Sequence, residues 1–305
     1  RSALALYFRH GYIPAPHCIY CGINKLLPGT YISLSSDQVR RGQTPQSQPY
    51  WSLRHVVEEG RSNGFVGSQE EAVSKLDSLI KQAVRGQMVA DVPLGAFLSG
   101  GIDSSTIVAL MQGHSNRPVR TFSIGFDEVN YNEARYAKAI AEHLGTDHTE
   151  LYVNSEQAMS IIPRLSTCFD EPFSDSSQIP TFLVAQLARR HVTVALSGDA
   201  GDELFGGYSR YMQGAELARR ILPWPISVRQ KLASVLRSLP SERLNRLSRS
   251  VCPLRWNIAN LGHKLCRLSG FLGAQSLEDL YRVLVSRWSD QNAIVIGAEE
   301  PEQLL

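Results

Sequence analysis

The string from Ser99 to Ser105, Ser-Gly-Gly-Ile-Asp-Ser-Ser, carries the strongest chemical signal in the chain. Gly100 and Gly101 allow backbone conformations closed to other residues, so successive main-chain N–H groups can surround an anion. The three serines add hydroxyl donors. Asp103 would repel a phosphate, and it suits such a loop only if Mg²⁺ lies between the two groups. The lysine of the P-loop is absent. We interpret the string as a different kind of pyrophosphate-binding loop.

A simpler explanation is a Gly-Gly turn in which Asp103 caps a helix. The neighbouring segments favour the pyrophosphate interpretation. Apolar Val92–Leu98 precedes the string and is typical of a buried strand, whereas Ser104–Met111 has helical spacing. A helix that starts here presents its positive end to the same loop.

A second group of carboxylates follows another apolar segment, Val192–Leu196. Ser-Gly at 197–198 ends this segment, and Asp199, Asp202 and Glu203 then place three carboxylates within five residues. In an α/β sheet both strings would lie at the carboxyl edge, where ligands bind. A divalent cation or a cationic substrate would offset the three like charges. The alternative is the acidic first turn of a helix.

Strand-like and helical segments alternate through the middle of the chain. This alternation predicts an α/β fold: a parallel twisted sheet with helices on both faces, followed by a helical extension. The expected strands are Val92–Leu98, Val119–Phe126, Thr149–Val153 and Val192–Leu196; the expected helices are Glu70–Val89, Ser104–Met111, Asn132–Leu144, Ser155–Cys168 and Ser177–His191.

Composition excludes several classes of protein. The 305 residues include 31 Lys or Arg and 29 Asp or Glu, a net charge of +2, and 43% are hydrophobic. These values exclude a disordered chain and a uniformly basic nucleic-acid binder. No apolar run reaches the roughly 18 residues of a membrane helix, so we expect no membrane partner. The five scattered cysteines argue against a disulfide framework and favour a cytoplasmic setting.

Together these segments resemble the N-type ATP pyrophosphatases, of adenine nucleotide alpha hydrolase-like fold. Within that superfamily they most resemble the C-terminal synthetase domain of the glutamine-hydrolysing asparagine synthetases. Three further strings carry the resemblance. Phe122–Phe126 resembles the strand that lines the adenine pocket in the family, and Asp170–Ser177 resembles its D-x-P-x-x-D-x-S segment. Ser197–Tyr208 resembles its second signature loop. The resemblance is dense over residues 91–211.

The resemblance implies a role for each site residue. Leu98, Ile124, Ser197 and Gly198 would contact the adenosine part of ATP, and Ser99, Gly100, Gly101, Asp103, Ser104 and Ser105 its phosphates. Asp103 and Asp202 would hold Mg²⁺. Asp199 is the catalytic candidate, because it stands where many members have a Glu linked to acyl-adenylate formation. The side chain of Asp is one methylene shorter than that of Glu. Two interpretations stay open: a changed position of the carboxylate, or a different acceptor substrate.

The implied activity is ATP-dependent amide synthesis by a ligase of asparagine biosynthesis. A small-molecule carboxylate, aspartate first among the candidates, would be activated as an acyl-adenylate with release of PPi. Ammonia derived from glutamine would then form the amide. Three alternatives stay open: amidation of another carboxylate such as a sugar acid, a tRNA-modifying adenylating enzyme, and a nucleotide-binding module without activity in this chain.

The resemblance also implies a domain order. Residues 1–35, with a K-L-x-P-G turn at 25–29, would be the end of a glutaminase domain; 36–68 a linker; 69–211 the ATP-pyrophosphatase core; and 212–305 a truncated helical extension. The glutaminase's nucleophilic cysteine and a downstream lysine segment are not found. We therefore expect a fragment of a longer polypeptide, whose missing glutaminase domain is its partner.

Three features have competing explanations. Between Arg219 and Arg267 there are eleven basic residues and one acidic residue, which could hold RNA, but the apolar spacing favours amphipathic helices. His148 could approach the site, but a structural histidine with satisfied hydrogen bonds is the better interpretation. Cys168, at the end of an expected helix, is interpreted as a buried thiol. The oligomeric state stays open, with a homodimer as one option.

Overall fold

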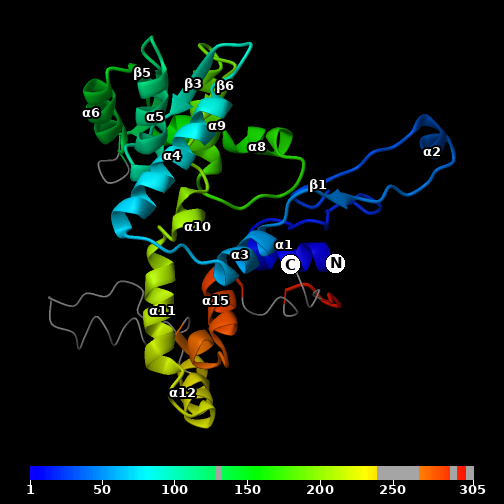
Figure 1. Ribbon diagram of the computed structural model, residues 1–305. Coiled ribbons are helices and arrows are strands. Elements are labelled where there is room, and N and C mark those ends of the chain that lie inside the picture. Colours follow the sequence, from blue (N-terminus) through cyan, green and yellow to red (C-terminus); the bar gives the residue numbers. More distant parts are fainter. Residues whose placement is uncertain (128–131, 239–267, 289–293, 300–305) are drawn as a thin grey trace. The chain divides into compact units, whose positions relative to one another are not determined.

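The computed structural model describes residues 1–127, 132–238, 268–288 and 294–299 (Figure 1). The chain divides into two compact units. One is Ile13–Asp202, and the other combines Arg1–Tyr12 with the chain from Glu203 onward. Each unit has hydrophobic cores of its own.

A four-stranded parallel sheet forms the middle of the first unit. Its strands are β3 (Leu94–Phe97), β4 (Arg120–Phe126), β5 (Asp147–Val153) and β6 (Val194–Leu196). Their order is β5-β4-β3-β6. Ala96 of β3 is in register with Thr121 of β4 on one side and with Leu196 of β6 on the other. The predicted α/β fold with a parallel sheet is confirmed.

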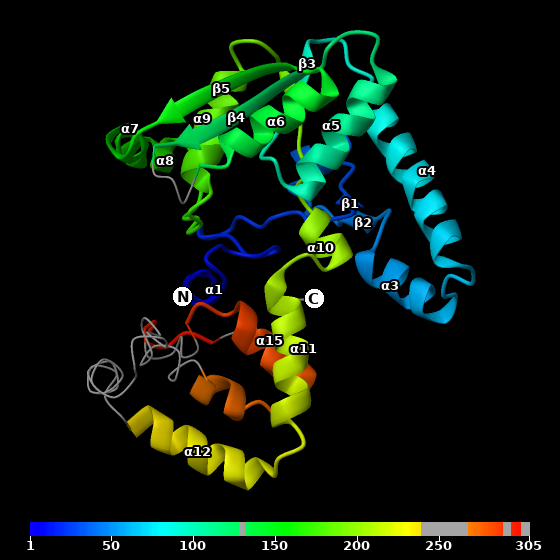
Figure 2. The ribbon, with the colours of Figure 1, turned by 90° about the vertical axis from the view of Figure 1, so that its left-hand side faces the viewer.

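Helices cover both faces of this sheet (Figure 2). The elements on one face are α4 (Gln69–Gln87), α5 (Ile102–His114) and α6 (Ala134–Leu144), and α9 (Gln178–Ala188) lies on the other. Successive side chains of a strand point to opposite faces. Ala96 therefore joins the core beneath α5, whereas its neighbour Phe97 packs against the core beneath α9.

The chain reverses its direction across the sheet at β3. It passes from β3 to β4 and β5 on one side, and then returns to β6 on the other side of β3. The carboxyl ends of β3 and β6 therefore form the switch point at which open α/β sheets bind ligands. Both predicted binding strings, 98–105 and 197–203, begin at this point.

Local sequence explains how several helices begin and end. Ser68 and Glu71 form a capping box at the start of α4, one residue before the predicted helix. The prediction of one helix over Ser155–Cys168 is wrong, because α7 (Ser155–Ser160) and α8 (Ile162–Cys168) are separate. Pro163 lies in the first turn of α8, and its missing N–H cannot continue the hydrogen bonds of α7.

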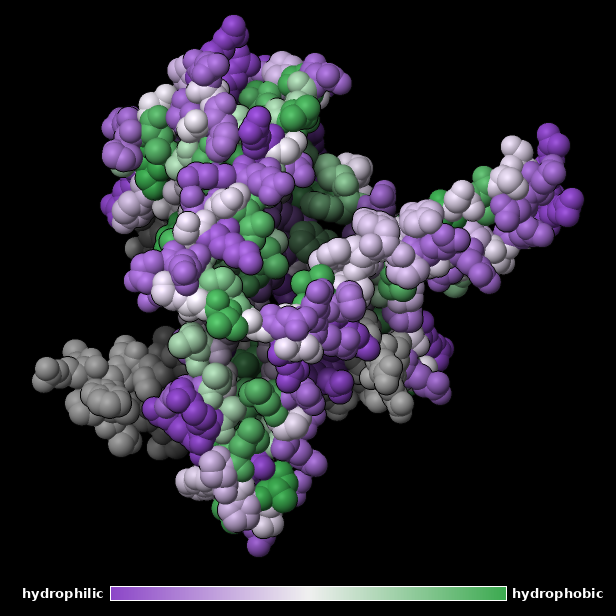
Figure 3. Space-filling view, in the orientation of Figure 1, coloured by the Kyte–Doolittle hydropathy of each residue, from purple (hydrophilic) through white to green (hydrophobic). Residues whose placement is uncertain are grey.

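An arm precedes α4 in the same unit. Its elements are β1 (Thr30–Tyr31), α2 (Ser36–Arg40), β2 (Gln48–Pro49), which pairs antiparallel with β1, and α3 (Leu53–Ser62). Gly29 has a φ of +71°, and a Cβ there would lie 2.2 Å from the carbonyl oxygen of Trp51, so this turn requires glycine. Neither α2 nor α3 contains a buried residue, and hydrophilic side chains gather at the tip around α2 (Figure 3). The predicted domain boundaries stay predictions.

The described part of the second unit is helical. It contains α1 (Ser2–His10), α11 (Ser209–Ile221), α12 (Ile226–Ser238) and α15 (Leu277–Val285), and α10 (Gly201–Phe205) joins the two units in sequence. Gly214 lets α15 approach α11, because a Cβ there would lie 2.5 Å from Leu284 Cδ1. None of the helices among the described residues has the length and apolar character required to cross a bilayer.

The described part of the basic stretch makes structural contacts. Arg229 is buried, and its guanidinium donates to the carbonyl oxygens of Trp224, Leu272 and Ala274. Arg219 and Arg220 both pair with Glu216 on α11. These contacts favour the amphipathic-helix interpretation for this part. The basic residues from Arg243 to Arg267 lie outside the described residues.

Candidate functional site

The first loop turns sharply from β3 into α5. The N–H of Leu98 donates to the carbonyl oxygen of Phe122 over 2.9 Å, which continues the sheet up to the loop. Gly100 then adopts a φ of +82°, and a Cβ there would lie 2.7 Å from Tyr136 Cβ and 2.8 Å from Ala137 N. The positive φ and the contact with α6 both exclude a side chain at Gly100.

The N-terminus of α5 opens onto this loop. Gly101 is the N-cap residue, and no side chain caps the helix. Asp103 lies in the first turn and is not the cap, so the simpler explanation as an Asp-capped turn does not hold. The first N–H groups of a helix have no partner within it, and the helix dipole makes that end positive. This arrangement suits a bound anion.

Two of the three serines shape the loop itself. Ser104 is buried, and its hydroxyl lies 2.9 Å from the hydroxyl of Ser99 and accepts from the Ser99 N–H over 3.2 Å. The Ser99 hydroxyl also accepts from the Gly101 N–H over 3.3 Å. Ser105 differs, because its buried Oγ has no hydrogen-bond partner among the described residues. The Ser105 hydroxyl is therefore enclosed without a partner among the described residues, and its predicted phosphate contact stays a prediction.

The second loop runs from β6 into α10 and has its own internal hydrogen bonds. The Ser197 hydroxyl donates to Asp199 Oδ2 over 2.9 Å and accepts from the Asp199 N–H over 3.4 Å. Ala200 then adopts a φ of +71°, which is unusual for a residue with a side chain. The exposed carboxylate of Asp199 is thereby held at the sheet edge.

The two loops are in close contact through glycines. A Cβ on Gly198 would lie 2.5 Å from Ser104 N, and a Cβ on Gly201 would lie 2.5 Å from Asp103 Cγ and 2.7 Å from Asp103 Oδ2. The second loop therefore packs directly on the first turn of α5. The structure brings the predicted pyrophosphate string and the second carboxylate string together.

The carboxylates of Asp103 and Asp202 are the two predicted magnesium ligands, and the Asp103 carboxylate packs on the second loop. It lies against Gly201, and the next residue along the chain is Asp202. Both side chains are partly exposed and offer the oxygen ligands that Mg²⁺ prefers. Within the described ranges, no group of three metal-ligating side chains forms a complete site. Two carboxylates still fit Mg²⁺, because this ion usually keeps several waters and binds substrate phosphates.

Leu98 and Ile124, predicted to contact adenosine, lie on opposite faces of the sheet. Leu98 is 1% exposed and its side chain belongs to the core beneath α5. Only its main chain could therefore meet a ligand. Ile124 is partly buried and packs in the cores on the α9 face. The adenosine contacts of both residues stay predictions.

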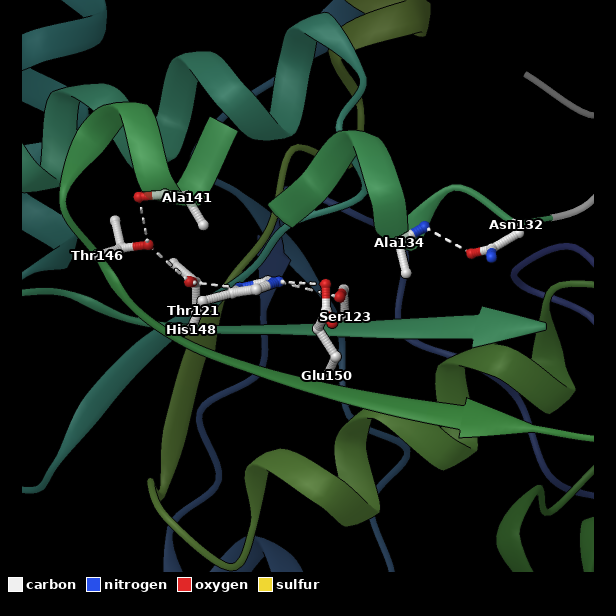
Figure 4. A network of polar contacts seen from close by, with 8 residues as sticks. All are labelled: Thr121, Ser123, Asn132, Ala134, Ala141, Thr146, His148 and Glu150. Carbon is white, nitrogen blue, oxygen red and sulfur yellow. Dashed lines mark hydrogen bonds and ion pairs between the residues drawn. The ribbon is translucent and has the colours of Figure 1, made fainter. Parts of the chain in front are cut away.

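His148 belongs to a buried polar network between β4 and β5 (Figure 4). Its Nδ1 lies 2.8 Å from the hydroxyl of Thr121, its Nε2 lies 3.2 Å from that of Ser123, and Glu150 is 3.7 Å away. Burial lowers the pKa of His148, although the Glu150 carboxylate opposes this effect. The interpretation of His148 as a structural histidine agrees with these contacts.

Other contacts have no signal in the sequence. The carboxylate of Glu171, within the predicted D-x-P-x-x-D-x-S segment, accepts from the N–H of Ile19 over 2.6 Å and pairs with Lys25. No spacing rule links residues so far apart. Cys168 is exposed, so the expectation of a buried thiol is wrong; α8 is short and buries none of its residues.

A parallel sheet covered on both faces, with two glycine-bearing loops in contact at its switch point, defines an α/β protein of the doubly wound class, whose ligands bind at that point. The family model described as Asparagine synthase matches residues 75–297. The chain belongs to this family.

Individual relatives agree with this assignment. The chain is 37% identical over 220 residues to a Methanocaldococcus jannaschii protein named "Putative asparagine synthetase [glutamine-hydrolyzing] 2", which covers 70% of this chain and 39% of that protein. It is 32% identical over 217 residues to asparagine synthetase [glutamine-hydrolyzing] 1 of Bacillus subtilis, covering 71% of this chain and 32% of the relative. The matched part thus spans about a third of the length of such relatives, 32% and 39% in these two.

Proposed function

We propose that this chain is the ATP-dependent synthetase part of a glutamine-hydrolysing asparagine synthetase. ATP and a carboxylate, most simply aspartate, are its substrates, and ammonia derived from glutamine is the nitrogen donor. The names of its relatives support the reaction class. The contact between the two loops at the switch point is the observation that carries the proposal.

The first step forms the acyl-adenylate. An oxygen of the substrate carboxylate attacks the α-phosphorus of ATP, and the bond between this phosphorus and the bridging oxygen of the pyrophosphate breaks. Main-chain N–H groups of the Gly100–Gly101 bend and of the uncapped α5 turn bind the β- and γ-phosphates. They stabilise the charge that develops on the leaving pyrophosphate.

Asp103 and Asp202 are the residues that would hold Mg²⁺. When bound, the ion neutralises negative charge on the phosphates. The role of the chain in this step is positional. The packing of Gly201 against Asp103 sets the carboxylate of the first loop beside the second loop.

The second step forms the amide. Ammonia attacks the acyl carbon, the bond to AMP breaks, and the nitrogen loses a proton as the amide forms. Asp199 belongs to the preceding step, as the residue of the second loop proposed to assist formation of the acyl-adenylate. The Ser197 hydroxyl fixes the Asp199 carboxylate, so its shorter side chain acts from a defined position.

ATP–PPi exchange tests the acceptor in this proposal. In the polypeptide carrying its glutaminase domain, exchange should require aspartate, and neither sugar acids nor tRNA should replace it. Exchange with a sugar acid but not with aspartate would support a second candidate function, the amidation of another carboxylate. The motivation for this candidate is Asp199, which stands where many family members have a Glu. ATP binding without exchange under any condition would support a nucleotide-binding module.

A further inference from the structure

The carboxylate of Glu171 contacts hydrogen-bond donors of a segment that is distant in sequence, residues 13–25. It accepts from the main-chain N–H of Ile19 over 2.6 Å and pairs with the ammonium group of Lys25. Next to it, the carbonyl oxygen of Asp170 accepts from the hydroxyl of Tyr20 over 3.2 Å. All these residues belong to the same compact unit.

Lys25 also makes two hydrogen bonds within the segment 13–25. Its ammonium group donates to the carbonyl oxygen of Ile13 over 2.5 Å, and its main-chain N–H donates to that of Pro16 over 2.9 Å. The segment 13–25 is therefore a folded loop in which one ammonium group contacts both the loop and Glu171. Breaking the Lys25–Glu171 pair would loosen the loop and its attachment together.

This pair differs from an ordinary surface pair. The Glu171 side chain is 15% exposed, whereas Asp77, which pairs with Lys81 on α4, is 49% exposed. Burial of the Glu171 carboxyl acts to raise its pKa, but the hydrogen bonds from Lys25 and Ile19 oppose this effect, and the pKa lies below its ordinary value. Hydrogen bonds to a charged group contribute more to stability than those of an exposed ion pair.

The two attached segments belong to different predicted parts of the protein. Residues 13–25 lie within the predicted end of the glutaminase domain, and Glu171 lies within the D-x-P-x-x-D-x-S segment of the predicted synthetase core. Ammonia released into water is protonated and diluted, so its transfer requires a fixed position of its source relative to its acceptor. Ammonia added in excess has no such requirement.

We propose that Glu171 and Lys25 are a positioning pair that couples glutamine-derived ammonia to amide synthesis. They hold segment 13–25 on the synthetase core and take no part in adenylation. This inference rests on the proposed function. It goes beyond that function by assigning the coupling to one ion pair and the neighbouring main-chain N–H of Ile19.

The test uses K25M, E171Q and the double variant in the polypeptide carrying its glutaminase domain, with K81M as the matched surface control. Amide synthesis is measured with glutamine and, separately, with excess ammonium salt. K25M should lower glutamine-dependent synthesis by about tenfold, the effect of losing a charged hydrogen bond. It should also raise the ratio of glutamate to amide product, while ammonia-dependent synthesis and K81M stay at the wild-type level. The double variant should be no worse than the poorer single variant.

Hydrogen exchange gives a readout independent of activity. In K25M and E171Q the amides of residues 13–25, that of Ile19 above all, should exchange faster than in K81M. Unchanged exchange, or equal losses with glutamine and with ammonium salt, would overturn the inference. Absence of ammonia-dependent synthesis in the wild-type protein would instead refute the proposed function.

Discussion

At the scale of single residues, the site depends on positions where a side chain has no room. A Cβ added to Gly198 would lie 2.5 Å from the backbone nitrogen of Ser104, and one added to Gly201 would lie 2.5 Å from Asp103 Cγ. Real Cβ atoms essentially never approach other atoms so closely. A side chain at either position would separate the two loops. The glycines of the second loop are therefore required by packing, and not only by flexibility.

Gly198→Ala should destabilise the protein and weaken ATP binding. The added methyl would meet Ser104 N at 2.5 Å, and backbone cannot yield as the end of a flexible side chain does. We expect the free energy of unfolding to fall by about 1–3 kcal/mol, as for other overpacked sites. Urea denaturation measures this change.

Gly113→Ala is the matched control, because Gly113 lies in α5 with no atom within 4 Å of an added Cβ. It should leave ATP binding unchanged and raise stability by up to about 1 kcal/mol through helix propensity. A Gly198→Ala protein as stable as Gly113→Ala would refute the packing of the two loops.

Ser104→Ala and Ser105→Ala should separate loop structure from ligand binding. Ser104→Ala removes the hydrogen bonds of this hydroxyl to Ser99 and Gly101, so the free energy of unfolding should fall by about 1–3 kcal/mol. Ser105 has no such partner to lose, so its variant should stay within about 0.5 kcal/mol of wild type. Its KM for ATP should rise. Thermal unfolding and exchange kinetics check both, and the reverse pattern would contradict the assigned roles.

At the scale of elements, the sheet places polar groups between β4 and β5 as well as at its edge. Thr121 and Ser123 on β4 hold both ring nitrogens of His148 on β5. Burial lowers the pKa of His148 below its ordinary value of 6.5, so the folded protein keeps the ring neutral at a pH where the unfolded chain binds a proton. Stability should therefore fall as the pH drops below about 6.5.

His148→Gln should reduce this dependence on pH. Gln can keep a hydrogen bond to the hydroxyls but does not titrate, so its free energy of unfolding should change less between pH 7.5 and 5.5 than that of wild type. Urea denaturation at both pH values checks this. Replacing the exposed His143 of α6 by Gln is the control and should preserve the wild-type slope. An unchanged slope in His148→Gln would show that another group is responsible.

Element types could be predicted from the sequence better than element boundaries. The apolar strands and the periodic helices gave the parallel α/β arrangement, because burial on both faces leaves a strong pattern. The break between α7 and α8 was missed although Pro163 was a visible signal. Both loops of the site were predicted because their glycines and carboxylates are contiguous in sequence.

At the scale of the whole molecule, long-range contacts could not be predicted. Glu171 and Ile19 are 152 residues apart, and a single sequence carries no trace of such a pairing. The burial of Arg229 within the basic stretch likewise has no signal in the sequence, because its carbonyl acceptors come from residues 224, 272 and 274. Burial of charge depends on the tertiary fold, and periodicity alone does not reveal it.

The most direct test of adenylation at these loops is ATP–PPi exchange by Asp103→Asn, measured beside Asp77→Asn. Asn keeps the size of Asp103 and its contact with Gly201 but removes the charge that would hold Mg²⁺. We predict that Asp103→Asn loses at least about 100-fold in aspartate-dependent exchange, as for other lost electrostatic groups. Asp77→Asn, on the surface of α4, should exchange at the wild-type rate. Equal exchange rates in the two variants would contradict adenylation at these loops.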